Sequence, residues 1–148
     1  MFDGQGYVID GLTTKNSGIF ANMNAAIVKN IAFTNVNLTG YYLSLFAKNF
    51  IRGKDYVNGF NGYEGAFQNV YISINSISYV GSNGAIGILT QGTLPGPVVV
   101  ENVVIDYLNV DATTQSKITA GNQFLMFGSS TLTMASDTAR FKNSFSIS

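Results

Sequence analysis

A short segment that occurs four times along the chain constrains the fold more than any other feature. Each copy begins with a long polar residue and an asparagine, and continues with alternating apolar and mostly polar residues. The copies are Lys29-Asn30-Ile31-Ala32-Phe33, Gln68-Asn69-Val70-Tyr71-Ile72, Glu101-Asn102-Val103-Val104-Ile105 and the weaker Lys142-Asn143-Ser144-Phe145. Their asparagines are 39, 33 and 41 residues apart. A period of two predicts strands with one buried face, and the spacing is too long for hairpins.

A second apolar segment follows each copy, at residues 43–49, 84–89 and 124–128. An earlier pair, residues 7–12 and 18–22, has the same order and apolar spacing but no asparagine in its first segment. The chain therefore reads as about four repeats of two strands each, the first and last incomplete. Residues 50–65, 91–97, 112–121 and 131–139 are predicted to be surface insertions, and we expect almost no helix.

Strand pairs that recur at this period cannot bury an apolar face alone, but stacked copies can. Equivalent strands would then pair in parallel about 4.8 Å apart, with equivalent side chains above one another. We expect Asn30, Asn69 and Asn102 to pass side-chain amide hydrogen bonds from one repeat to the next. The predicted inner ladders are Ile31, Val70 and Val103; Phe33, Ile72 and Ile105; and Phe20, Phe46, Ile88 and Phe127.

The pattern F-D-G-x-G-Y-x-I-x-G-L, then G-I-F, then I-x-N-I-x-F-x-N-V, resembles the repeats of right-handed parallel β-helices. Such repeats occur in bacterial surface adhesins, those with GLUG-type repeats among them, and in phage tail and appendage proteins. The resemblance covers nearly the whole chain, although repeats of about 35 residues are longer than is usual for these families. It implies an all-β, right-handed parallel β-helix of about four coils with surface loop insertions. It also implies a single domain over residues 1–148, as a module of a larger extracellular, cell-surface or virion protein.

Composition excludes several classes of function. Charged residues make up only 11% of the chain, against the usual ~25%, and the net charge is zero. There is no basic cluster to bind nucleic acid. With neither cysteine nor histidine, the chain cannot build a thiolate or imidazole metal site, or a Ser-His-Asp triad. We expect no cofactor and no metal, and no apolar run approaches the ~20 residues of a membrane span.

No pair of acids is placed for glycan cleavage, which requires two carboxylates roughly 5–9.5 Å apart across the bond. In the expected stack Asp106 points outward, with Thr34 and Ser73 beside it and Asp10 three spacings away, about 14 Å. No catalytic residue is therefore predicted. Asp3-Gly4 recurs nowhere else as a calcium-binding repeat would require, so a plain Asp-Gly turn is expected.

Aromatic residues in two polar segments are the best candidates for ligand binding, because exposed rings can stack on sugars while nearby Asn and Asp bind hydroxyl groups. These residues are Tyr41, Tyr42, Tyr56, Phe60 and Tyr63. Alternatively, Phe60 and Tyr63 only attach their own loop to the stack.

We expect a non-catalytic structural and adhesive module that contacts glycan or protein through its loops. The alternative is a polysaccharide-degrading lyase or hydrolase, which an acid pair on one outer face would favour. A jelly-roll lectin would show Asn-Gly hairpins between alternating strands, whereas Asn58-Gly59 and Asn61-Gly62 lie within one loop. No capping element is visible at either end of the repeats, which predicts end-to-end self-association, a homo-oligomer, or capping by neighbouring sequence.

Overall fold

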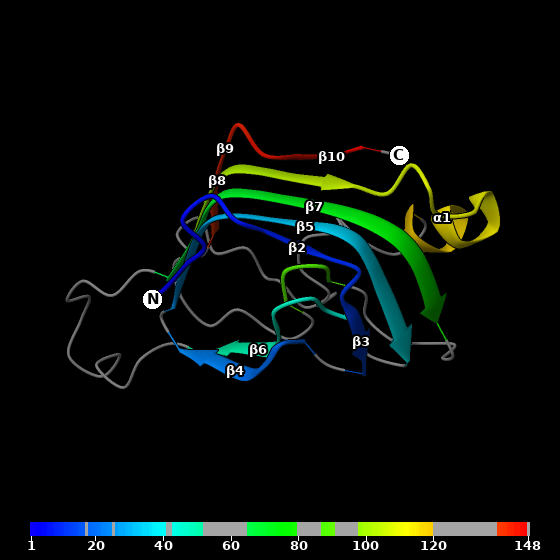
Figure 1. The fold of residues 1–148 in the computed structure, drawn as a ribbon, viewed down its shortest axis with the longest axis horizontal. Coiled ribbons are helices and arrows are strands. Elements are labelled where there is room, and N and C mark those ends of the chain that lie inside the picture. The colour runs from blue at the N-terminus through cyan, green and yellow to red at the C-terminus, as the bar shows by residue number, and fades with distance from the viewer. Residues whose placement is uncertain are drawn as a thin grey trace.

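The structure is a computed structural model that describes residues 1–16, 18–24, 26–40, 43–51, 65–79, 87–90, 98–119 and 139–147. The larger sheet contains β1 (Phe2–Asp3), β2 (Val8–Asp10), β3 (Thr13–Lys15), β5 (Ile27–Gly40), β7 (Gly65–Tyr79), β8 (Val98–Asp106), β9 (Ala139–Lys142) and β10 (Phe145–Ile147). The smaller sheet contains β4 (Phe20–Asn24) and β6 (Ala47–Ile51). All strand pairs among the described residues are parallel (Figure 1). The predicted all-β class with parallel pairing is confirmed for this part of the chain.

Successive copies of the asparagine segment lie side by side, in the strand order β5, β7, β8. The register places Phe33 beside Ile72, and Ile72 beside Ile105, and all three side chains are fully buried. Ile31, Val70 and Val103 form a second buried row in the same way. Equivalent apolar side chains therefore pack on one another along the inner face of the sheet.

The asparagine in each copy marks a corner in its strand. Asn30, Asn69, Asn102 and Asn143 all have positive φ, between 49° and 54°. This left-handed conformation costs asparagine less than most residues, because its short polar side chain tolerates it. At the corners of β5, β7 and β8 two residues face outward between buried neighbours, as Lys29 and Asn30 do between Val28 and Ile31. The corners allow long strands such as β5 and β7 to bend around the core (Figure 1).

The core lies between the larger sheet and the smaller one, which faces its concave side in Figure 1. Phe46 fills this space just before β6. Its ring centroid lies 5.4 Å from that of Phe33 on β5 and 5.4 Å from that of Phe67 on β7. All three rings are fully buried, so they join the two sheets into one core.

The third predicted ladder is wrong for the residues that the structure describes, and Phe127 lies outside them. Phe20 pairs with Ala47 instead of the expected Phe46. Ala47 pairs with Thr90, so Ile88 is not the partner of Phe46 either. A shift of one residue moves a side chain to the other face of a strand. Every residue from 43 to 47 is buried, Ser44 included, so buried and exposed positions do not alternate in this segment and cannot fix its register.

Part of the predicted insertion at 112–121 is a short helix, the one helix among the described residues, in which almost no helix was expected. Helix α1 (Ala112–Thr119) begins after Asp111, whose Oδ1 accepts a hydrogen bond from the Thr114 backbone N–H at 2.9 Å. The Thr114 hydroxyl donates to the other carboxylate oxygen at 2.6 Å. An aspartate in this N-cap position satisfies helix N–H groups that otherwise lack partners. The signal was present in the sequence as Asp111 ahead of a run without glycine or proline.

The first strands form one edge of the larger sheet, since β1, β2 and β3 pair only with β5 among the described residues. A tight turn follows β1: the Tyr7 N–H donates to the Gly4 carbonyl at 2.8 Å, and Gln5 and Gly6 have positive φ. Next to β1 an apolar cavity of about 260 Å³ is lined by Met1, Phe2, Phe20, Asn22, Met23, Ala26, Ile27 and Val28. Short, interrupted edge strands make it harder for a strand of another chain to pair with this edge. The apolar cavity has the opposite effect, because a partner that covers it would bury apolar surface. The predicted end-to-end association stays a prediction.

Candidate functional site

The five aromatic residues predicted to bind a ligand, Tyr41, Tyr42, Tyr56, Phe60 and Tyr63, lie outside the described residues. The candidate site is therefore sought on the outer face of the larger sheet, which β1, β2, β5, β7, β8 and β10 form together. Outward side chains that share a register form columns across these strands. Three such columns lie side by side on this face, each crossing the strands.

The first column is a chain of asparagine side chains. Asn143 Nδ2 donates to Asn102 Oδ1 at 3.3 Å, Asn102 donates to Asn69 at 2.9 Å, and Asn69 donates to Asn30 at 2.9 Å. Asn30 Nδ2 donates to the carboxylate of Asp3 at 3.2 Å. All four donors point toward the N-terminal edge of the sheet. We call this column the amide ladder, and it extends beyond Asn30, Asn69 and Asn102 at both ends.

Asp3 ends the amide ladder as a fixed acceptor. Hydrogen bonds from the Gln5 backbone N–H and from Asn30, together with the nearby Lys29 ammonium, hold the pKa of its carboxyl below the ordinary value. A carboxylate can only accept hydrogen bonds, so Asp3 cannot donate to a further residue and the ladder ends there. The sequence did not predict that Asp3 ends the ladder, because Asp3 aligns with Lys29 and not with Asn30, the asparagine of the next repeat.

The ladder predicts that Asn69→Ala destabilises the protein more than Asn69→Gly does. Both changes remove the two amide hydrogen bonds, which together contribute about 1–3 kcal/mol. Only alanine also has to adopt the positive φ of 53° at this corner, at a further cost of about 1 kcal/mol. Urea denaturation of the two variants measures the difference, and equal losses would contradict the assigned role of asparagine in the backbone conformation.

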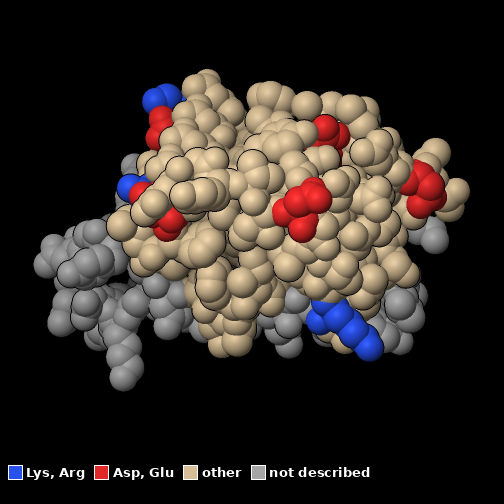
Figure 2. All heavy atoms as spheres, viewed as in Figure 1, with Lys and Arg blue, Asp and Glu red and all other residues tan. Residues whose placement is uncertain are grey.

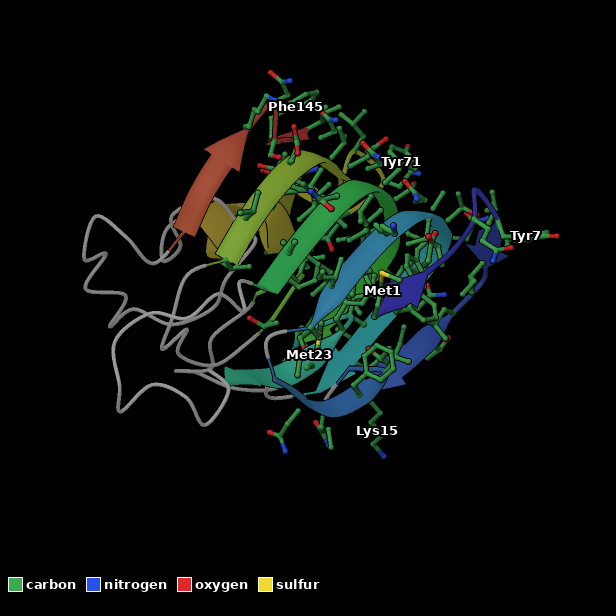
Figure 3. All side chains as sticks on the ribbon, turned by 90° about the vertical axis from the view of Figure 1, so that its left-hand side faces the viewer. Met1, Tyr7, Lys15, Met23, Tyr71 and Phe145 are labelled. Atoms are coloured by element: carbon green, nitrogen blue, oxygen red, sulfur yellow. The ribbon has the colours of Figure 1, made fainter. Side chains whose placement is uncertain are left out.

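The second column, which we call the apolar column, faces outward although it consists of apolar residues: three of its members are exposed and two, Ala32 and Val104, are partly buried. Its members are Val8, Ala32, Tyr71, Val104 and Phe145. Val8 is 59% exposed, Tyr71 38% and Phe145 53%. Figure 3 shows Tyr71 and Phe145 on the same outer side of the sheet, pointing away from the strands.

The third column carries hydroxyl and carboxylate groups. These groups belong to Asp10, which pairs with Thr34, and to Ser73, which pairs with Asp106. A register shift between Phe33 and Val36 of β5 lies between the two pairs, and the column ends at the apolar Ile147 of β10. The Thr34 hydroxyl and the Asn35 amide donate to Asp10 Oδ1 at 2.6 and 2.7 Å. The Tyr71 hydroxyl donates to Asp106 Oδ2 at 3.1 Å, which connects the apolar column to this one. Burial, and then the bond to Asp106 and its charge, raise the pKa of Tyr71, so its hydroxyl keeps its proton as a donor.

A second group of amides lies further along β5 and β7, where sequence reasoning placed nothing. Asn37 Oδ1 accepts hydrogen bonds from Asn75 Nδ2 at 3.0 Å and from the Ser76 hydroxyl at 2.6 Å. Asn35, two residues earlier, has a positive φ of 51°. This is a second corner, and its signal in the sequence was the pair of asparagines at positions 35 and 37.

The two acids of the third column are too far apart for glycan cleavage. Asp10 lies on β2 and Asp106 on β8, three strand spacings apart across β5 and β7, or about 14 Å. The hydrogen bonds from Thr34 and Asn35 also lower the pKa of Asp10, whereas a general acid requires a raised one. Among the described residues, no group of three or more acids could hold a metal ion.

Charge is sparse on this side of the molecule. Figure 2 shows small, separate groups of acidic and basic side chains with wide uncharged surface between them. Two of the cations are paired with acids: Lys29 Nζ lies 3.3 Å from Asp3, and Lys142 Nζ lies 2.7 Å from Glu101. The face therefore offers hydroxyl, amide and carboxylate groups beside apolar ones, with little free positive charge.

Comparison of the chain with protein-family models, with curated proteins and with solved structures gives no match. Within the part of the chain that the structure describes, no helix has the length and hydrophobicity that a membrane span requires.

Proposed function

We propose that this chain is a right-handed parallel β-helix of about four coils. It would serve as a non-catalytic structural and adhesive module of a bacterial surface protein or a phage tail or appendage protein. Parallel connections within a sheet are almost always right-handed, which supports the handedness. The corners at Asn30, Asn69, Asn102 and Asn143 recur at the same place in each repeat, which supports a continuous coil.

One observation supports the structural role above the others: a single uninterrupted ladder of hydrogen bonds joins Asn143 to Asp3 across every repeat. Such a ladder stiffens a stack without doing chemistry. A rigid, regular rod with sparse charge suits a protein that spans distance outside the cell and presents a surface to glycan or protein partners. The location that goes with this proposal is the cell surface or the virion.

The proposal predicts that the protein releases neither reducing ends nor unsaturated products from neutral or acidic polysaccharides. The reason is that Asp10 and Asp106, the two acids of the third column, are too far apart to act together across a glycosidic bond. Product assays over many hours, with a commercial glycosidase and a pectate lyase as positive controls, test this. Turnover that Asp106→Asn abolishes would overturn the proposal and favour a polysaccharide-degrading enzyme instead.

A further inference from the structure

We propose that the outer face binds an extended, uncharged polysaccharide, whose chain lies along the apolar column and crosses the strands. This inference rests on the proposed function and gives its surface contact a ligand class. The contact is assigned to the sheet face itself, at Tyr71, Phe145 and the polar columns on either side of them.

The apolar column has the shape that a linear ligand needs. It crosses β2, β5, β7, β8 and β10 as one unbroken row. Tyr71 and Phe145 are two strand spacings apart, about 10 Å, with Val104 between them. A surface that repeats at each strand presents similar contacts to each successive unit of a polymer. Both aromatic residues lie on the outer side of the sheet and reach solvent (Figure 3).

The neighbouring columns supply the polar contacts of a sugar site. A sugar ring has apolar C–H groups on its faces and hydroxyl groups around its rim. Amide groups of the ladder lie on one side of the apolar column, and Thr34, Ser73, Asp10 and Asp106 lie on the other. An apolar centre with a few polar groups beside it is the usual composition of a small-molecule or cofactor site.

The charges on this face favour an uncharged glycan. Asp10 is held in its carboxylate form by hydrogen bonds from Thr34 and Asn35, so it would repel an acidic polymer. The cations nearest the columns, Lys29 and Lys142, are already paired with carboxylates. Nothing in this arrangement would attract uronate, sulfate or phosphate groups.

A polypeptide partner fits the same surface less well. Adding a strand requires a sheet edge, but the backbone groups under this face are already paired with neighbouring strands. A standard protein interface buries about 800 Å² on each partner around a broad apolar centre. Here the apolar strip is one residue wide and bordered by polar columns.

Affinity electrophoresis tests the proposal, with the whole chain run in native gels that contain hydroxyethylcellulose, galactomannan, mixed-linkage β-glucan or dextran. Gels with polygalacturonate or alginate are the acidic comparison. We expect retardation by at least one neutral polymer and none by the acidic ones. Tyr71→Ala and Phe145→Ala should each weaken binding about 2- to 10-fold, and the double variant by about tenfold or more.

The matched control is Ile19→Ala. The exposed fraction of Ile19, 41%, is similar to the 38% of Tyr71, but Ile19 lies just before β4 of the smaller sheet and away from the apolar column. It should leave binding unchanged, and circular dichroism of all variants should match that of the parent chain. No retardation in any neutral gel, or retardation that the double variant retains, would overturn the inference. Stronger retardation by an acidic polymer would overturn it as well. A negative result without product release would leave the non-catalytic function standing, whereas product release would remove that function whatever the gels show.

Discussion

Replacement of Phe33 by alanine is expected to lower the free energy of unfolding by about 3–5 kcal/mol. Phe33 is fully buried, lies beside Ile72 in the inner row and packs edge-on against the Phe46 ring at 5.4 Å. Alanine would leave a cavity where the two sheets meet, and the rigid strands on either side could not close it. Chemical denaturation followed by circular dichroism gives the loss.

Thr34→Ala is the matched control, one residue along the same strand and on the other face. It removes the hydroxyl that donates to Asp10, a solvent-accessible hydrogen bond, so we expect a loss of only about 0.5–1 kcal/mol. Comparable losses for the two variants would mean that the inward and outward residues of β5 have been assigned to the wrong faces.

The sequence was most informative where two periodic signals coincided. The apolar residues one and three positions after each asparagine indicated the buried face, and the recurring asparagine indicated the register, so Phe33, Ile72 and Ile105 could be aligned from the sequence alone. Neither signal exists in residues 43–47, which are buried on both faces. There the aromatic residues were aligned with one another, and the true pairing of Phe20 with Ala47 was missed by one position.

The corners were only half predictable. The sequence suggested that Asn30, Asn69 and Asn102 would stack through their amides, but the left-handed backbone that these residues share has no separate signal in composition or period. Helix α1 is a different case. Asp111 is a suitable N-cap residue and could have indicated a helix, but residues 112–121 were interpreted as a loop because the rest of the chain has strand periodicity.

The outer face could be predicted in its polar part and not in its apolar part. Asp10, Thr34, Ser73 and Asp106 follow from the register, and so does the distance that excludes an acid pair. The apolar column was missed because outward positions were assumed to be polar. An alignment of the four copies does show an apolar residue two positions after each asparagine, which is the signal that would have found Tyr71 and Phe145.

Replacement of Gly18 by alanine is expected to destabilise the protein by about 1–3 kcal/mol, although only one methyl group is added. A Cβ atom at this position would overlap the carbonyl group of Phe46 and the amide nitrogen of Ala47. Those are backbone atoms, so they cannot move aside as a flexible side chain would. The added methyl would push β4 away from β6 and break the hydrogen bond from the Phe20 N–H to the Phe46 carbonyl, at 2.7 Å. Thermal and urea denaturation measure the loss.

Gly11→Asn is the control for Gly18→Ala. It tests whether the loss at Gly18 comes from steric overlap at that position or from replacing any glycine of the first repeat. Gly11 has a positive φ of 71°, and nothing lies within 4 Å of where its Cβ would be. Asn35 occupies the corresponding corner of the next repeat with a φ of 51°, so asparagine suits this backbone. We expect a change within about 0.5 kcal/mol. If Gly11→Asn were as costly as Gly18→Ala, the first repeat would not share its corner with the second. If Gly18→Ala were neutral, β4 and β6 could not approach each other as closely as the structure has them.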